Sequence, residues 1–347
     1  MSIPFIQKAR IGAYICRQRL WGNGRFPFVL MLEPLFRCNL RCKGCGKIDY
    51  PEEILKKMMS TEECVAAAEE CGAPVVSIAG GEPLLHPQIS VIVREITARK
   101  KFVYLCTNSL LVEKRIRDFE PSSYLTFNVH VDGMNEQHDD RVCLKGVFDK
   151  AIAAIRLLIS HGFRVTTNTT LFNGETAESA SNLFDLLTSL RVEAMTIASA
   201  FSYQNASDQK NFFKRDEAIK LFRSIFELGK GKNWRFNHSG LYLDFLAGNQ
   251  DYACLPWGNP TRNIFGWQRP CYLLNDGYEP SFQKLMKNTD WPKYGVGRDP
   301  RCTHCMIHCG FEPTAVMDSA KHPVKAMKVS WRGVNGRQRK ENFSIRG

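Results

Sequence analysis

Three cysteines, Cys38, Cys42 and Cys45, stand in one short stretch of the chain with the spacing C-x3-C-x2-C. Thiolates are soft ligands that suit an iron site. A [4Fe–4S] cluster normally takes four cysteines, so three of them leave one iron open to bind another molecule. A structural zinc site needs four closed ligands, and the next histidine, His86, lies far downstream. The spacing therefore favours an iron–sulfur cluster over a zinc site or a chance group of free thiols.

An apolar run at residues 28–34 ends in a proline, and it predicts a buried strand that leads into the cysteine loop. A capping box at Ser60 and Glu63 then predicts the start of a helix. Beyond it, strands are expected at residues 75–79, 102–106, 124–131, 164–170 and 193–198, with helices at 61–70, 87–100, 148–161 and 177–190. This alternation is typical of parallel strands joined by crossover helices, and it gives six βα steps.

Unusual residues lie where these strands end. In barrels built from βα steps, the catalytic residues lie at the carboxyl ends of the strands. The second strand is followed by Gly80-Gly81-Glu82-Pro83, and two glycines let the backbone approach a ligand closely. The other polar residues at strand ends are Asn108, His130, Asp132 and, on the fifth strand, Asn168. Each of these features has a plainer interpretation as an ordinary turn or turn cap.

The cysteine spacing, the Gly-Gly-Glu-Pro turn and the six βα steps together resemble the radical S-adenosylmethionine (SAM) superfamily. The resemblance implies an α/β fold, a six-stranded partial (β/α) barrel over residues 26–228, with a [4Fe–4S] cluster on Cys38, Cys42 and Cys45. The open iron would bind the amino and carboxylate groups of SAM. It further implies SAM contacts from Gly80, Gly81, Glu82, Pro83, Asn108, His130, Asp132 and Asn168. Two positions depart from the superfamily pattern: Gly44 replaces the usual aromatic residue, and His130 replaces a serine.

Residues 229–320 form a different region, in which the alternation fades and aromatic residues, prolines and glycines increase. This region is predicted to be a cysteine-rich C-terminal extension. It contains Cys254, Cys271, Cys302, Cys305 and Cys309. Three interpretations remain open. The last three cysteines with Cys254 or Cys271 would hold a second iron–sulfur cluster, cysteines with His304 or His308 would bind zinc, or the cysteines would serve as small core residues.

Composition sets the cellular context. The chain has 347 residues, of which 44% are hydrophobic, and 13 cysteines. It opens without a signal-peptide pattern and has no apolar run of transmembrane length, so a reducing cytoplasm is expected and the cysteines are ligands or thiols rather than disulfides. The net charge is +12, with a concentration of basic residues in 321–347, which predicts a basic flexible tail.

Residues 1–25 predict a basic amphipathic helix. Its apolar positions recur at helical spacing and are Phe5, Ala9, Ala13, Cys16 and Leu20. Ile11 and Ile15 fall on the opposite side of this stripe. Such a helix can lie on an anionic bilayer, or it can simply cap the main domain. A lipid substrate would favour the interpretation that it binds a bilayer.

Four tracts, at residues 38–51, 77–87, 128–140 and 257–278, resemble the radical SAM proteins of hopanoid biosynthesis. This resemblance implies transfer of a 5′-deoxyadenosyl group to the alkene of diploptene, a triterpene, with SAM consumed and methionine released. The partners would be the apolar triterpene and an electron donor such as flavodoxin or ferredoxin, with peripheral contact at the inner face of the membrane and no nucleic acid. A peptide-modifying radical enzyme with an auxiliary cluster is the alternative. A zinc-dependent nucleic-acid module fits the six βα steps poorly.

Cys106 is predicted to be the catalytic hydrogen donor. Addition of a radical to an alkene leaves a carbon radical that needs a hydrogen atom, and a thiol gives one up readily. Cys106 ends the third strand, at the reactive mouth of the barrel. The plainer interpretation is a buried strand cysteine that acts as a small hydrophobic residue.

Overall fold

The fold is that of a computed structural model that describes residues 4–201, 206 and 209–332. Its main element is a nine-stranded sheet in the order β6-β5-β4-β3-β2-β1-β7-β8-β9. The first six strands are parallel to their neighbours and confirm the predicted partial (β/α) barrel. They are β1 (Val29–Glu33), β2 (Val75–Ile78), β3 (Phe102–Thr107), β4 (Leu125–His130), β5 (Arg164–Leu171) and β6 (Ala194–Ser199).

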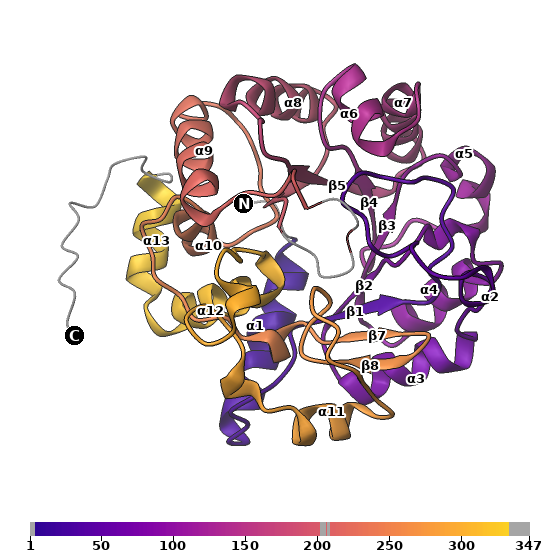
Figure 1. The fold of residues 1–347 in the computed structure, drawn as a ribbon, viewed down its shortest axis with the longest axis vertical. Helices are drawn as coiled ribbons and strands as arrows, with labels where there is room; N and C mark the ends of the chain where they lie inside the picture. Colours follow the sequence, from indigo (N-terminus) through magenta and orange to yellow (C-terminus); the bar gives the residue numbers. More distant parts are fainter. Residues whose placement is uncertain (1–3, 202–205, 207–208, 333–347) are drawn as a thin grey trace.

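The helices that connect these strands cover the outside of the barrel (Figure 1). The four predicted ones are α3 (Thr61–Cys71), α4 (Ile89–Ala98), α7 (Val147–Ser160) and α8 (Ala177–Ser189). The capping box that starts α3 is present, because the Ser60 hydroxyl accepts from the Glu63 amide and the Glu63 carboxylate accepts from the Ser60 amide. Additional helices of this part are α2 (Glu52–Leu55), α5 (Val112–Arg115), α6 (Asn135–Val142) and α9 (Arg215–Leu228).

The C-terminal extension is built into the wall of the barrel. Its strand β7 (Thr261–Asn263) pairs in parallel with β1, and β8 (Gly266–Gln268) and β9 (Tyr278–Glu279) continue the sheet in antiparallel fashion. At the other edge, the Met195 amide of β6 donates to Arg235 O at 2.8 Å and the Asn237 amide donates to Met195 O at 2.8 Å. The extension therefore attaches to both edges that a six-stranded partial barrel leaves open.

Four helices complete the extension. They are α10 (Gly240–Leu246), α11 (Phe282–Asn288), α12 (His308–Lys321) and α13 (Pro323–Arg332). The flexible tail predicted from residue 321 is therefore wrong for its first part, because α13 begins with a proline, which suits a first helical turn, and continues with good helix formers. Residues 333–347 of that prediction lie outside the described residues.

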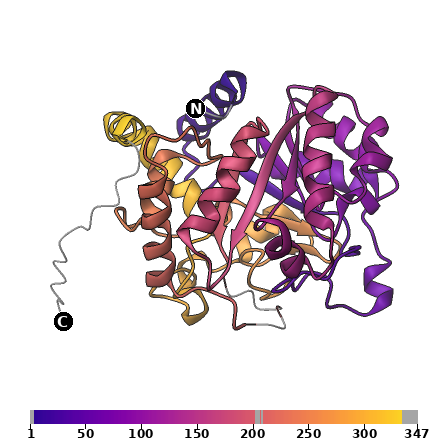
Figure 2. The ribbon, with the colours of Figure 1, turned by 90° about the horizontal axis from the view of Figure 1, so that it is seen from above.

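The N-terminal helix α1 (Phe5–Leu20) lies across one end of the barrel (Figure 2). Its buried side carries Gln7, Ile11, Tyr14 and Ile15. The stripe expected to define its apolar side points away from the protein, since Ala9, Ala13, Cys16 and Leu20 are exposed. The sequence pattern therefore identified a helix with two usable faces but did not show which face packs on the protein.

Candidate active site

The cysteine loop follows β1 at the carboxyl end of the barrel, and the Gly-Gly-Glu-Pro turn supports it from behind. The Gly81 amide donates to Leu35 O at 3.0 Å, and the Glu82 amide donates to Arg37 O at 2.9 Å. A side chain at Gly81 would place its Cβ 2.1 Å from Arg37 O, and one at Gly80 would be 2.3 Å from Leu35 O. These two positions thus have room only for glycine, and the backbone they approach is that of the chain itself.

Glu82 ties this turn to the end of β3. Its buried carboxylate accepts from the Asn108 amide at 2.7 Å, from the Thr107 hydroxyl at 2.8 Å and from the Leu84 amide at 3.0 Å. Burial raises the pKa of Glu82 to about 7, although these hydrogen bonds act in the opposite direction. The oxygens of Glu82 are thus used inside the protein, where they fix the turn to the end of β3. Pro83 starts the buried 3₁₀ turn that follows.

Asn108 links β3 to the cysteine loop. Its amide nitrogen donates to the Asn39 side chain at 2.7 Å and approaches the Cys38 sulfur at 3.7 Å. Burial raises the pKa of Cys38 to about 11. It also raises the pKa of Cys42, and a charge on Cys45 or Cys38 would raise it further. An iron–sulfur cluster bound by this loop would hold these sulfurs as thiolates.

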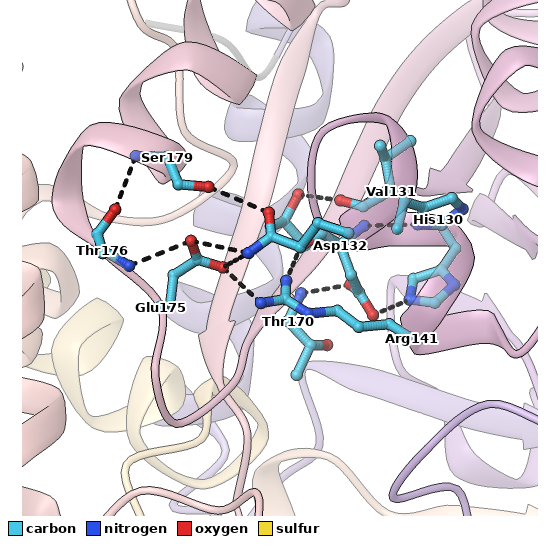
Figure 3. A network of polar contacts seen from close by, with 11 residues as sticks. His130, Val131, Asp132, Arg141, Thr170, Glu175, Thr176 and Ser179 are labelled. Carbon is cyan, nitrogen blue, oxygen red and sulfur yellow. Dashed lines mark hydrogen bonds and ion pairs between the residues drawn. The ribbon is translucent and has the colours of Figure 1, made fainter.

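The half-buried His130 and the buried Asp132 form a pair at the end of β4 (Figure 3). The His130 Nε2 and Asp132 Oδ2 atoms are 2.6 Å apart, and the Thr170 amide donates to Asp132 Oδ1 at 2.7 Å. Burial by itself lowers the pKa of His130, but the Asp132 charge leaves it raised above its usual value. The pKa of Asp132 is correspondingly lowered. The pair therefore favours an imidazolium–carboxylate contact, which leaves little free hydrogen-bonding capacity on Asp132.

A second layer of charged residues holds this pair in place. Arg141 donates to the Asp132 carbonyl and, through Nη2, to Glu175 at 2.6 Å. Gln137 also donates to Glu175 and accepts from Ser179 at 3.1 Å. The network joins the end of β4 and α6 to the β5–α8 connection, so it fixes two strand-end connections relative to each other. The sequence did not point to Arg141 or Glu175.

A cavity of about 440 Å³ runs through the inside of the barrel. Glu33, Lys47, Gly80 and Asn168 line it at the carboxyl end, so Asn168 faces the interior as expected. At the amino end the lining is largely apolar and comprises Ile11, Phe28, Val29, Val75 and Val316. The cavity is thus polar beneath the cysteine loop and apolar at the far end, and its volume is that of a small-molecule site.

Cys106 lies in the wall of this cavity. The Ser77 hydroxyl lies 3.6 Å from its sulfur, and the Asn128 amide donates to the sulfur at 3.5 Å. Asn128 is held by Thr166, whose hydroxyl donates to Asn128 Oδ1 at 3.0 Å. Burial raises the pKa of the Cys106 thiol, so the protonated form is favoured. The structure therefore places a protonated thiol against the interior space, with two polar neighbours that orient it.

Several cavity residues were missed by the sequence analysis. Lys47 and Glu33 form a buried ion pair at 2.8 Å just below the cysteine loop. On the extension side, His238, His308 and Glu312 line the cavity, and His238 Nδ1 is 3.2 Å from the Glu312 carboxylate. Burial lowers the pKa of His308 to about 3, which keeps it neutral. Period-two alternation could have identified Asn128, two residues before His130 on β4, but nothing local signals the extension residues.

The five cysteines of the extension meet at one small, apolar cavity. They come from three segments: the connection after α10, the turn after β8, and the residues around the start of α12. Burial raises the pKa of Cys254 and of Cys309, and in both cases charges on other members of the group would raise it further. The five residues are Cys254, Cys271, Cys302, Cys305 and Cys309. His304 is exposed and His308 lines the other cavity, so neither joins this group.

Neither cysteine group is arranged around a single metal ion. Among the described residues, no three cysteine, histidine, aspartate or glutamate side chains are positioned to hold one ion. A [4Fe–4S] cluster spreads its cysteine ligands over separate irons, so this result speaks against zinc more than against a cluster. The donor sets, which are thiols only, fit iron–sulfur clusters at both places.

Comparison with known families agrees with this geometry. Residues 32–187 match the model of the radical SAM superfamily, and residues 195–329 match a domain of unknown function, DUF3463. The first match assigns residues 32–187 to the radical SAM superfamily, and for this part of the chain it implies a [4Fe–4S] cluster and SAM. The two matched regions meet between residues 187 and 195, just before β6.

Curated relatives include GTP 3′,8-cyclase from Clostridium perfringens, which is 24% identical over 272 residues, or 73% of this chain and 82% of the relative. GTP 3′,8-cyclase 1 from Mycobacterium tuberculosis is 25% identical over 179 residues, or 48% of this chain and 50% of the relative. Among solved structures, Streptococcus suis SuiB bound to S-adenosylmethionine aligns with a TM-score of 0.61 at 16% identity, covering 75% of this chain and 63% of that chain. These similarities support the fold.

A second structural neighbour, anSMEcpe with bound AdoMet, aligns with a TM-score of 0.58 at 14% identity. The alignment covers 88% of this chain and 99% of that chain. The likeness therefore extends through the C-terminal extension as well as the barrel, and it is a likeness of fold.

Proposed function

We propose that this protein is an adenosylhopane synthase, which joins the 5′-deoxyadenosyl group of SAM to the alkene of diploptene. The observation that carries the proposal is the interior cavity, which is polar beneath the cysteine loop and apolar at its far end. A fused-ring hydrocarbon with one reactive end would place its alkene beside the polar end and its apolar body in the remainder. The four sequence tracts that resemble the hopanoid-pathway proteins support the same assignment.

Cys38, Cys42 and Cys45 would hold the cluster, and the polar strand ends above the cavity would hold SAM. When bound, these groups supply a 5′-deoxyadenosyl radical that adds to an alkene. Lys47 and Glu33 already neutralise each other, so the carboxyl end of the cavity offers polar atoms without an unpaired buried charge. A substrate that fills the barrel would displace water from the cavity, which would protect a reactive species from side reactions.

Cys106 completes the proposed reaction. Addition forms a carbon–carbon bond and leaves one unpaired electron on the substrate. The Cys106 thiol then gives a hydrogen atom to that carbon, and its sulfur recovers an electron from the electron donor and a proton. Ser77 and Asn128 fix the direction from which the hydrogen arrives, so these residues would set the configuration of the product.

The extension cavity supports a second iron–sulfur cluster. Its five thiols and apolar shell provide soft ligands away from water. We assign the role of ligands to Cys302, Cys305 and Cys309 with Cys254 or Cys271. An electron donor such as flavodoxin or ferredoxin would reduce the protein.

A peptide-modifying enzyme is the second candidate, because the extension of this chain shares its fold with anSMEcpe, which has also been solved with a Cp18Cys peptide, and with SuiB, which has been solved with a precursor peptide. Such an enzyme abstracts a hydrogen atom and releases 5′-deoxyadenosine in step with its product. The proposed synthase instead retains the adenosyl group in its product.

The deciding experiment is anaerobic reconstitution with iron and sulfide, followed by incubation with SAM, a reductant and diploptene. Mass spectrometry should detect a product that carries the mass of diploptene plus the 5′-deoxyadenosyl group and one hydrogen. Formation of 5′-deoxyadenosine alone, with diploptene unchanged, would reject the synthase and favour the peptide-modifying candidate.

A further inference from the structure

We propose that α1 and α13 form a surface that docks on an anionic lipid bilayer, and that the substrate enters the cavity at the end that α1 covers. The route of entry rests on the proposed function, whereas the docking surface does not. Both helices lie on the same side of the molecule, at the top of Figure 2. Among the helices of the described residues, none is long and apolar enough to cross a bilayer, so the contact would be peripheral.

The inner side of α1 closes the amino end of the barrel. Gln7 Nε2 donates to the Tyr104 hydroxyl at 3.1 Å, and the Tyr14 hydroxyl donates to Pro27 O at 2.8 Å. Gln7 and Ile11 line the cavity directly. A few side-chain contacts thus separate the apolar end of the cavity from the outside, where α1 is the cover.

The outer side of α1 exposes large apolar side chains. Leu20 is 86% exposed and Trp21 is 64% exposed, although each would gain free energy by leaving water. On α13, Val324 is 59% exposed and Met327 is 64% exposed. Exposed apolar side chains gathered on one side of a molecule mark an interaction surface. A tryptophan at the end of an amphipathic helix suits the boundary between headgroups and acyl chains.

The charge of both helices identifies an anionic partner. The sequences of α1 and α13 contain no aspartate or glutamate. The basic residues described on them are Lys8, Arg10, Arg17 and Arg19 in α1, and Lys325 and Lys328 in α13. Lys325 is paired with Asp318 of α12 at 2.7 Å, so the positive excess comes mainly from α1 and Lys328. Basic residues beside exposed apolar ones favour a membrane with anionic lipids, each contributing about 1 kcal/mol near the surface. An apolar protein partner would gain nothing from this excess of positive charge.

The surface formed by α1 and α13 lies beside the apolar end of the cavity, where a lipid substrate could enter. Arg19 of α1 donates to the Met317 sulfur of α12 at 3.7 Å, and Val316 of the same helix lines the cavity. The apolar end of the cavity, which α1 covers, would therefore face the bilayer, while the cysteine loop at the opposite end of the strands stays in water. A triterpene entering from this side would move through the apolar end before its leading end reached Cys106.

The test uses the reconstituted full-length protein and sonicated vesicles of phosphatidylcholine, with or without phosphatidylglycerol. The protein should co-sediment with the anionic vesicles and much less with the neutral ones. The double variant Leu20→Ser, Trp21→Ser should bind anionic vesicles about tenfold more weakly, because it removes two apolar contacts. Leu144→Ser, which alters a leucine 46% exposed outside these helices, is the matched control and should bind normally.

A second variant tests the charges. Arg17→Gln with Arg19→Gln should weaken binding to anionic vesicles by about tenfold at low salt, and high salt should shrink this difference because it screens exposed charges. Equal binding of the unchanged protein to neutral and anionic vesicles would overturn the electrostatic part. Unchanged binding of the Leu20→Ser, Trp21→Ser variant would overturn the docking surface.

The route of entry is tested by turnover. With diploptene embedded in anionic vesicles, the Leu20→Ser, Trp21→Ser variant should lose activity about as much as it loses binding, whereas with diploptene in detergent it should match the unchanged protein. Equal loss in both assays would overturn the route. If vesicle binding behaves as expected but diploptene is never consumed, the proposed function and the route fall and the docking surface stands.

Discussion

Cys38, Cys42 and Cys45 belong to one short loop, whereas the five cysteines of the extension come from three segments that meet only in the folded protein. The first group stands at the open carboxyl end of the barrel, partly exposed to solvent. In the second group, Cys305 and Cys309 are buried and the rest are partly buried behind an apolar shell. A group that must bind an exchangeable molecule needs access, while a group that only holds a cluster does not.

The two groups therefore differ in what brings their cysteines together: the local sequence in the loop, and tertiary contacts in the extension. The loop group takes its spacing from the chain and its orientation from neighbours such as Gly81 and Asn108. The cysteines of the extension come together only when the chain folds. Cys254, for example, packs against the start of α12, where a Cβ at Gly310 would lie 2.4 Å from the Cys254 sulfur. Replacing one cysteine should therefore have different consequences in the two groups.

The largest effect is expected for Cys42→Ala. It should lower product formation and SAM cleavage by at least about a thousandfold, because no other group replaces the chemistry that the cluster supplies. It should also remove about four irons. Cys143→Ala is the control, because this cysteine is exposed and lies close to Cys42 in the fold. A Cys42→Ala protein that keeps both its iron–sulfur spectrum and SAM cleavage would disprove the role of the loop.

For the extension, the unchanged protein should hold about eight irons after reconstitution, and Cys305→Ala should hold about four. The variant should still cleave SAM, because the loop cluster remains. Its thermal stability should fall by more than that of Cys71→Ala, which alters a buried cysteine outside both groups. About four irons in the unchanged protein, with all five extension thiols open to alkylation after unfolding, would show that the cysteines are merely core residues.

An intermediate effect is expected for Cys106→Ala. Carbon–carbon bond formation should persist, but hydrogen delivery should slow about tenfold or more and yield mixed stereoisomers, because the oriented donor is gone. Asn128→Leu is the sharper variant, since it keeps the thiol and removes one of the groups that orient it. It should keep most of the rate and lose part of the stereochemical purity. A single isomer at an undiminished rate from Cys106→Ala would identify another donor.

The strands and helices of the barrel were predictable because their signals are local. Alternation, capping at Ser60 and the loop cysteines all lie within short windows, and each predicted barrel strand is present. The environment of Cys106 was only partly predictable. Its place on β3 followed from alternation, whereas Ser77 and Asn128 become its neighbours through sheet register.

The strands and cavity residues of the extension could not be predicted from the sequence, and the reason is physical. Its strands β7, β8 and β9 are very short and gain their stability by adding to β1, so the chain contains no independent strand signal for them. The same holds for His238 and Glu312, which reach the cavity only because the extension attaches to both edges of the barrel. Long-range contacts of this kind leave no periodic trace in the sequence.

The smallest effect concerns Glu82, which joins the turn behind the cysteine loop to β3. Its pKa is about 7 in the folded protein, above the value of 4.5 typical of a free glutamate. Between these two values the folded state holds a proton that the unfolded state has released. The contribution of Glu82 to stability should therefore fall as pH rises through this window, by at most roughly 3 kcal/mol, and then level off.

The variant Glu82→Gln cannot lose a proton, so the fall should vanish from its stability curve. Urea unfolding under anaerobic conditions at several pH values between about pH 4.5 and about pH 8 measures this difference directly. Glu113→Gln, which alters an exposed glutamate on α5, should keep the slope of the unchanged protein. If Glu82→Gln also keeps that slope, the carboxylate is ionised throughout. In that case, its three hydrogen bonds outweigh the penalty of burial and hold the turn behind the cysteine loop through a permanent charge.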